Sequence, residues 1–222
     1  MITTSPVLRP LATAFAAALL LAAAGAAQAT ITVYTTLAAF TAATTAPGTD
    51  TFTGMSITST TPSPITRSAG VYGYTAAAST STFFAGGTIA NPWLSTNIAT
   101  DTITFNTFTG GAQAIGGNFF GSDISGLFAA GGVTLSATDA SGTVTQVITS
   151  ASVTSFLGFV SNGVGVTSMT LAAIQPAGAV LWPTADNLVL ARVAAVPEPG
   201  TYALMLAGLG LVGLVARRRR AA

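Results

Sequence analysis

The chain has 222 residues, of which 50% are hydrophobic and only 6% are charged, against roughly 25% charged residues in an ordinary soluble domain. Cysteine, histidine and lysine are absent, which excludes disulfides, thiolate metal sites, histidine catalysis and Schiff-base chemistry. Between the terminal segments, two arginines stand against five aspartates. A nucleic-acid-binding protein needs a basic face, so we expect no nucleic acid among the partners.

The first segment, residues 1–29, has the layout of a secretory signal peptide. Arg9 is its one charged residue, an apolar run covers residues 11–24, and Ala27-Gln28-Ala29 supplies the small-residue pattern that signal peptidase requires. We expect export, with cleavage after Ala29. An N-terminal membrane anchor is the alternative, which the shortness of the apolar run disfavours.

One short helix is predicted at the start of the following domain. In "TTLAAFTAATTAPG", Leu37 and Phe40 fall on one side of a helix, and Pro47-Gly48 would end it. The stretch 53–87 is rich in Ser, Thr, Gly and Pro. We expect irregular loops or edge strands there.

The rest of the domain indicates β-strands. "DTITFNTF" alternates, with Ile103 and Phe105 on one face, and two alternating arms around residues 139–142 predict a β-hairpin. Further alternating segments follow at intervals of about 8–12 residues, the spacing of a sandwich or barrel. The predicted fold is mainly β: a single antiparallel β-sandwich of jelly-roll-like type over residues 30–195.

The acidic residues of this domain form no local pair. A glycosidase needs two carboxyl groups about 5–10 Å apart, and the five aspartates are dispersed along the chain. We expect no catalytic residues, no metal site and no cofactor. A hydrolase whose aspartates converge from distant loops stays open, as does a structural calcium ion held by oxygen ligands.

Two tryptophans suggest a carbohydrate-binding site. Trp93 lies in "ANPWLSTN", and Trp182 lies in "VLWPTADN" together with Asp186 and Asn187. Both segments have the composition of loops, where an aromatic side chain tends to be exposed. The alternative is that the tryptophans are buried in the core of the sandwich.

The C-terminal segment, residues 196–222, has three parts in order. Pro197-Glu198-Pro199 comes first, then an uncharged run of 16 residues from Thr201 to Ala216, then four arginines. A helix of that length spans about 24 Å, against about 30 Å for the hydrocarbon core of a bilayer. We expect residues 200–216 to form a short transmembrane helix in the inner membrane, with Arg217, Arg218, Arg219 and Arg220 as a cytoplasmic stop-transfer block. A solvated or nucleic-acid-binding arginine block and a rigid proline linker are the alternatives.

The segment "VPEPGTYALMLAGLGLVGLVARRRR" resembles the PEP-CTERM sorting signal of Gram-negative bacteria. The resemblance implies processing by exosortase, a membrane-embedded transpeptidase-like enzyme. It implies that Pro197, Glu198 and Pro199 are the residues that exosortase recognises and that the four arginines are the stop-transfer block. Two prolines around Glu198 keep the backbone extended and accessible. Gly200 departs from the Ser or Thr that often follows the second proline.

Together these features predict a non-catalytic, exported cell-surface or extracellular-matrix protein. Its processing partners would be signal peptidase and exosortase, and its precursor would be tethered to the inner membrane. We expect association with exopolysaccharide, a biofilm or the cell envelope. Alternatively, the domain is a lectin-like carbohydrate-binding module delivered by the same route.

Overall fold

The computed structural model describes residues 30–194 and 199–220. Residues 30–194 form a β domain and residues 199–220 form a helix. The predicted signal peptide with Ala27 and Ala29, and Pro197 and Glu198 of the sorting motif, lie outside the described residues.

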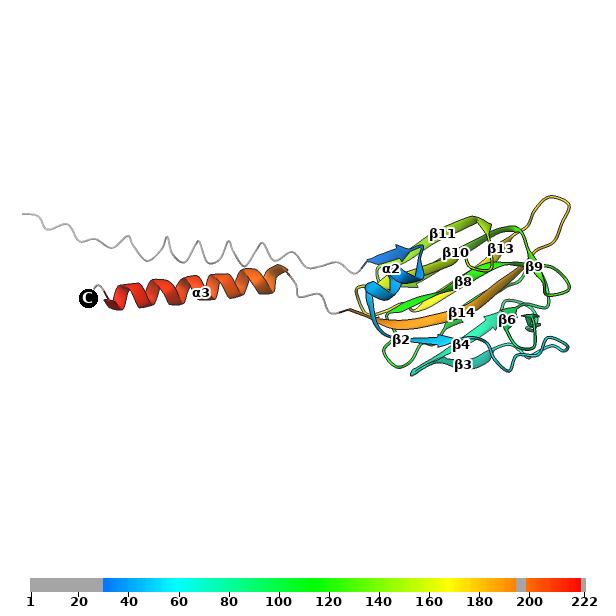
Figure 1. The fold of residues 1–222 in the computed structure, drawn as a ribbon, viewed down its shortest axis with the longest axis horizontal. Coiled ribbons are helices and arrows are strands. Elements are labelled where there is room, and N and C mark those ends of the chain that lie inside the picture. The colour runs from blue at the N-terminus through cyan, green and yellow to red at the C-terminus, as the bar shows by residue number, and fades with distance from the viewer. Residues whose placement is uncertain (1–29, 195–198, 221–222) are drawn as a thin grey trace, which may run out of the picture. The chain divides into compact units, whose positions relative to one another are not determined.

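Two antiparallel sheets make up the β domain (Figure 1). The strands of the first sheet are β1 (Ile31–Tyr34), β2 (Thr44–Asp50), β5 (Gly86–Gly87), β6 (Pro92–Ser95), β8 (Ala114–Ser122), β9 (Phe128–Ala129), β12 (Phe156–Ser161) and β14 (Trp182–Val193). Their order is β1-β12-β8-β14-β6-β5, with β2 also paired to β14 and β9 to β8. The strands of the second sheet are β3 (Ile65–Ala69), β4 (Tyr72–Ala78), β7 (Thr102–Asn106), β10 (Gly131–Asp139), β11 (Gly142–Ala151) and β13 (Ser168–Ile174). Their order is β11-β10-β13-β7-β4-β3.

One hydrophobic core lies between the two sheets. Phe119 and Leu188 enter it from the first sheet, and both are fully buried. Phe105 and Leu135 enter it from the second sheet and are equally buried. Each such side chain stabilises the fold by about 1.5–3 kcal/mol. The predicted antiparallel arrangement of a mainly β domain is therefore confirmed.

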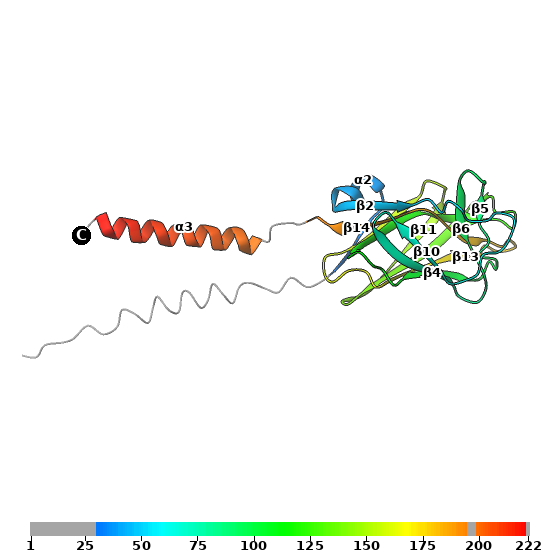
Figure 2. The same ribbon diagram turned by 90° about the horizontal axis from the view of Figure 1, so that it is seen from below.

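Helix α2 (Leu37–Ala42) covers the outer face of the first sheet (Figure 2). Thr36 is its N-cap, with Oγ1 accepting a hydrogen bond from the Ala39 amide at 3.2 Å. Phe40 is fully buried in a second apolar cluster with Phe156 and Val160 of β12. The helix is shorter than the sequence predicted. The chain enters β2 at Thr44 because its backbone pairs there with β14.

The stretch 53–87 is more ordered than the sequence predicted. β3 is an edge strand, as expected, but β4 lies between β7 and β3 inside the second sheet. Tyr72, Tyr74 and Ala76 alternate into the core from β4. The prediction was wrong here because Gly73 and the three alanines that end β4 concealed the alternation.

The hairpin predicted around residues 139–142 is confirmed. β10 and β11 pair antiparallel, with Asp139 opposite Gly142 at the turn. The Asp139 carboxylate accepts a hydrogen bond from the Ser141 amide at 2.7 Å, the local bond typical of aspartate in turns.

Helix α3 (Pro199–Arg220) contains the run that the sequence predicted to be helical. It begins at a proline, whose fixed φ and missing N–H suit the first helical position. Within residues 30–194 and 199–220, the structure has no helix whose length and apolar character would let it cross a membrane. The transmembrane part of the prediction is thus unsupported, in keeping with an apolar run that falls short of the bilayer core.

Both ends of the β domain lie at the same end of the sandwich. The Thr30 amide donates to Asn162 Oδ1 at 2.6 Å beside the end of β12, and the Ala194 amide donates to the Ala43 carbonyl at 3.1 Å. β14 has 12 residues and spans roughly 35–40 Å at 3.3 Å per residue. Its last residue, Val193, lies at this end of the sandwich. Its first residue, Trp182, therefore marks the opposite end, which we call the distal end.

Candidate functional site

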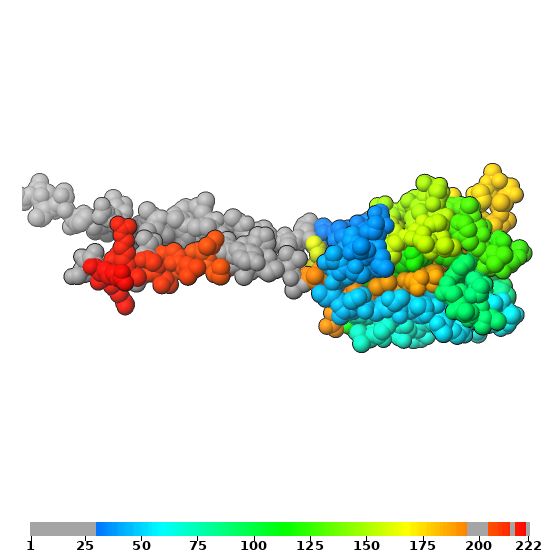
Figure 3. Space-filling view, viewed as in Figure 1, coloured from blue at the N-terminus to red at the C-terminus, as the bar shows by residue number. Residues whose placement is uncertain are grey.

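A shallow pocket of about 200 Å³ opens at the distal end of the first sheet. It lies where β6 and β8 end and β14 begins. The loops that follow β8 and precede β14, green and yellow-orange in Figure 3, form this end of the domain. The lining residues are Phe84, Ser95, Thr96, Asn97, Ser122, Asp123, Ile124, Gly126 and Trp182.

The floor of the pocket is a cluster of hydroxyl groups. Ser95 pairs with Thr184, and their strand neighbours point into the core, so both side chains point to the outer face of the sheet. Thr184 and Ser122 hydroxyls lie 2.7 Å apart, Thr184 donates to Ser95 at 3.2 Å, and Ser95 donates to the Pro183 carbonyl at 3.0 Å. All three hydroxyl residues are buried. This mutual bonding makes the floor polar and rigid.

The walls combine one aromatic ring with polar side chains. Trp182 is half-buried, and Asn97 is exposed at the rim. Asp123 Oδ1 accepts hydrogen bonds from the amides of Ser125 at 2.8 Å and Leu127 at 3.0 Å. These two bonds fix the carboxylate in the turn after β8. Both of them use Oδ1, and neither uses Oδ2. The pocket thus offers an aromatic surface and hydrogen-bonding groups that are held in place.

Among the residues that the structure describes, no cationic side chain lines this pocket. The described β domain holds two arginines. Arg67 is bound to Asp50 at 2.7 Å, and Arg192 donates to the Gly110 carbonyl at 2.7 Å near the other end of β14. The site therefore has no group that would neutralise an anionic ligand.

The structure separates the two tryptophans that the sequence singled out. Trp93 lies in β6, with its ring 4.9 Å from that of Phe120 at an interplanar angle of 88°. Its Nε1 is buried and makes no hydrogen bond within the described residues. Trp182 lines the pocket, whereas Trp93 packs as part of the fold. Both lie in strands, so the prediction of loops at these positions was wrong.

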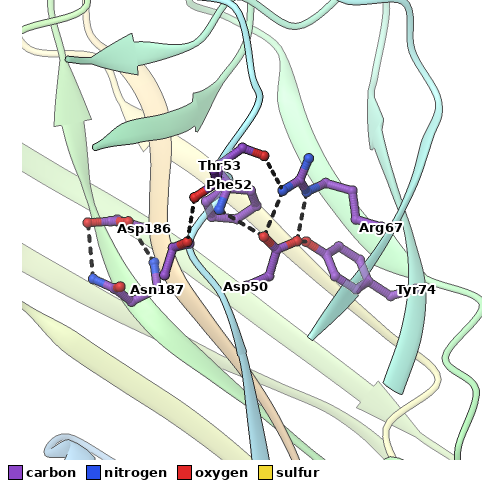
Figure 4. A network of polar contacts seen from close by, with 8 residues as sticks. Asp50, Phe52, Thr53, Arg67, Tyr74, Asp186 and Asn187 are labelled. Carbon is purple, nitrogen blue, oxygen red and sulfur yellow. Dashed lines mark hydrogen bonds and ion pairs between the residues drawn. The ribbon is translucent and has the colours of Figure 1, made fainter. Parts of the chain in front are cut away.

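Asp186 and Asn187 form a β-bulge further along β14. Asn187 has a positive φ of 50°, and its amide donates to Asp186 Oδ1 at 2.8 Å (Figure 4). Asn187 Nδ2 bonds both Asp186 and Asn118. Burial raises the pKa of Asp186, although hydrogen bonds from Asn187 and Asn91 oppose that rise. These two residues shape the strand, and neither lines the pocket.

A second polar network joins the two sheets (Figure 4). Asp50 of β2 accepts two hydrogen bonds from the Arg67 guanidinium of β3, each at 2.7 Å. It also accepts one from the Tyr74 hydroxyl of β4 at 2.7 Å. Burial alone would raise the pKa of Asp50, but these bonds outweigh it and hold the pKa below its usual value. Burial and the neighbouring Asp50 carboxylate raise the pKa of Tyr74. The carboxylate stays charged and bridges the sheets.

The remaining aspartates are likewise bonded within the fold. Asp101 accepts hydrogen bonds from the hydroxyls of Ser79 at 2.9 Å and Thr80 at 2.6 Å, and from Ser81. Asp139 accepts one from the Ser161 hydroxyl at 2.7 Å. The hydroxyl bonds outweigh burial, so the pKa of each lies below its usual value.

Asp50 and Asp186 lie on neighbouring strands but on opposite faces. Asp50 pairs with Leu188, whose side chain enters the core, whereas Asp186 pairs with Asn118 on the outer face. Within the described residues, no three acidic side chains come together. The expectations about catalysis, cofactors and a structural calcium ion stay predictions.

Helix α3 presents exposed apolar side chains and a basic end. Leu204, Leu206 and Leu209 are 62–72% exposed. Arg217–Arg220 form its last turn and are exposed, where positive charge is favoured by the helix dipole. The stop-transfer role of these arginines stays a prediction.

Sequence reasoning found Trp182 but not its neighbours in the pocket. Asp123 stands in "SDISG", a pattern that indicates a turn, yet nothing in that pattern connects it with a tryptophan 59 positions later. Asn97 follows Trp93 in the segment "ANPWLSTN", but the structure places it in the pocket with Trp182. The sheet register brings these residues together.

A family model described as the PEP-CTERM protein-sorting motif matches residues 195–220. No curated protein matches the chain, and no solved structure does. The match coincides with the segment whose sequence resembles that motif, and so confirms the resemblance. The β domain lies outside the matched residues.

Proposed function

We infer that this chain, which carries a PEP-CTERM protein-sorting motif at residues 195–220, is exported to the cell surface by the exosortase route. We propose that its β domain is a non-catalytic module associated with the exopolysaccharide of the cell surface or biofilm. The sorting motif supports the inference of export, because it implies exosortase as the processing partner. We propose that signal peptidase removes residues 1–29.

The outer face of the second sheet supports association with a hydrated, uncharged polymer. Cross-strand pairing places Thr145, Ser136, Thr170 and Thr104 in one row over four adjacent strands. The Ser136 and Thr145 hydroxyls lie 2.7 Å apart. Such a row of hydroxyl and methyl groups can exchange hydrogen bonds with sugar hydroxyls without desolvating a charge.

The bonding of the aspartates supports a non-catalytic role. Most glycoside hydrolases use a pair of carboxyl groups in a cleft, and the environment of each sets its pKa apart from that of the other. Asp50, Asp101 and Asp139 hold their charges through internal hydrogen bonds, and the raised pKa of Asp186 belongs to a bulge outside the pocket. Each aspartate with a shifted pKa thus has a structural explanation.

The lectin-like alternative has one specific observation in its favour. The pocket at the distal end contains a half-buried tryptophan, a fixed carboxylate and an exposed amide. Binding by this pocket and contact through the second sheet are compatible, because the two surfaces belong to different sheets.

The sorting proposal is tested by replacing one residue of the motif. In the native host, wild-type protein should reach the surface fraction with a shortened C-terminus, as measured by mass spectrometry of the chain ends. Glu198→Gln should be exported but keep its full-length tail, because the charged residue between the two prolines is lost. Thr49→Ala, in the exposed part of β2, is the control and should be processed normally. Normal processing of Glu198→Gln, or of wild type in a host without exosortase, would contradict the proposal.

A further inference from the structure

We propose that the distal pocket formed by Trp182, Asn97 and Asp123 binds a single ring of a neutral saccharide. This inference rests on the proposed function, since that function brings the chain into contact with polysaccharide. It adds the binding site, the class of ligand and the residues that select it.

The size of the pocket suits one sugar ring. Its volume is about 200 Å³, smaller than the roughly 300–1,000 Å³ of pockets for drug-sized ligands. It is open to solvent at the distal loops, so the neighbouring rings of a longer chain can continue outside it. A terminal or branch-point residue of a polysaccharide fits these limits.

The chemistry of the lining matches the two kinds of surface that a pyranose presents. The face of the Trp182 ring carries negative charge density, which attracts the weakly positive C–H groups on one side of a sugar. Asn97 supplies both a donor and an acceptor, and Asp123 supplies a carboxylate acceptor for sugar hydroxyls. Stacking thus places the ring, and the polar groups select the positions of its hydroxyls.

The lining is preorganised. Ser122 and Ser95 are held by the hydroxyl cluster on the floor, and Asp123 is held by two backbone amides. Trp182 starts β14, where its backbone pairs with Ser122. A rigid site loses little conformational entropy on binding, which a shallow pocket with few contacts requires.

The charge of the site selects neutral ligands. Asp123 is the one charged side chain among the described lining residues, and both arginines of the described β domain are bonded elsewhere. A uronic acid or a sulfated sugar would place its negative charge near Asp123 without a compensating cation. We therefore expect uronates to bind much more weakly than neutral hexoses.

The location also favours a binding role. The pocket lies at the opposite end of the sandwich from Thr30 and Ala194, through which the domain joins the terminal segments. A ligand at the distal end therefore lies about the length of β14 away from Ala194, the last described residue of the β domain.

Tryptophan fluorescence tests the proposal directly. The chain contains two tryptophans, so the full chain with Trp93→Phe reports on Trp182 alone. We would titrate this variant with neutral hexoses, their β- and α-linked tetrasaccharides, and glucuronate. The expected result is a saturable change in emission with at least one neutral sugar and a Kd at least about tenfold higher for glucuronate.

Two substitutions in the same background identify the pocket. Asn97→Ala removes an exposed amide and should raise the Kd about tenfold. Asp123→Asn keeps an oxygen that can accept the turn hydrogen bonds but removes the negative charge. It should raise the Kd for neutral sugars and reduce the ratio of the Kd for glucuronate to the Kd for neutral hexoses. Thr49→Ala, at an exposed position of β2 outside the pocket lining, is the control and should leave the Kd unchanged.

Three results would overturn the inference: no saturable change with any neutral sugar, a change that Asn97→Ala leaves intact, or glucuronate binding as tightly as the hexoses. These results are independent of sorting. If the chain is not processed by exosortase but Trp182 reports sugar binding, the proposed function fails and the pocket stands. If the chain reaches the surface and no sugar binds, the sorting proposal stands and the proposed saccharide site fails.

Discussion

Asp50 and Asp186 of the β domain are buried to the same extent, but their hydrogen-bond partners differ. Asp50 is 5% exposed and bonded to a guanidinium and a phenol. Asp186 is 5% exposed and bonded to asparagines. A full positive charge lowers the pKa of a buried carboxyl, whereas amide dipoles do not fully offset burial. The same residue type is therefore a stabilising anion at one position and a carboxyl group whose ionisation burial disfavours at the other.

Replacing Asp50 with Asn should lower the free energy of unfolding by about 3 kcal/mol at pH 7, because Arg67 would be left buried without its counter-ion. The pKa of Asp50 is lowered in the folded state, so its contribution to stability is present above the unfolded-state pKa of about 3.9. That contribution is lost as the pH falls through the folded-state pKa. Urea unfolding at pH 7 and pH 3 measures both effects: the difference between wild type and Asp50→Asn should shrink at pH 3.

Asp186→Asn is the matched control for that experiment. The pKa of Asp186 is raised in the folded state, so its neutral form favours folding below the unfolded-state pKa and ionisation removes that benefit as pH rises. A neutral asparagine should therefore cost little stability at pH 7. Equal destabilisation by the two substitutions would show that burial, and not the Arg67 charge, sets the state of Asp50.

At the scale of elements, the short helix α2 depends on packing more than on its own propensity. Six residues are too few for an isolated helix to be stable in water. Its fully buried Phe40 lies 5.5 Å from the ring of Phe156. Gly158 leaves room for this ring, since a Cβ there would approach Phe40 to 2.4 Å. The glycine of β12 and the phenylalanine of α2 therefore form one packing unit.

Replacing Phe40 with Ala should destabilise the β domain by about 3–5 kcal/mol, through lost burial and the cavity left on the outer face of the first sheet. Thermal unfolding followed by circular dichroism measures the effect. Leu37→Ala, on an exposed position of the same helix, should change the Tm little. A small effect of Phe40→Ala would mean that α2 docks without this contact.

An element could be predicted from the sequence where the residues that fix it are neighbours in the chain. Ile103 and Phe105 alternate with threonines, and the turn at Asp139 is set by neighbouring residues, so β7 and the β10–β11 hairpin could be predicted. The end of α2 and the interior place of β4 could not. Both are decided by pairing with strands that are distant in sequence.

At the scale of the whole molecule, the described members of the hydrophobic clusters of the β domain all lie between Ile31 and Val193. A chain that ends at Ala194 should therefore unfold with a Tm within about 1 °C of the full chain, because each domain folds around its own core. Differential scanning calorimetry of the two proteins measures this. A clear drop in Tm on truncation would show that residues after Ala194 support the fold.

The sequence by itself determined the sorting of this protein and the class of its fold. The motif is a linear pattern over residues 195–220, so the order of its residues along the chain is sufficient to identify it. Alternation with a period of two residues likewise indicates strands before any contact is formed. Only the tertiary structure decided which side chains share a site. Trp182, Asn97 and Asp123 meet because β6, β8 and β14 pair in one register, and register depends on contacts between segments that the sequence pattern does not connect.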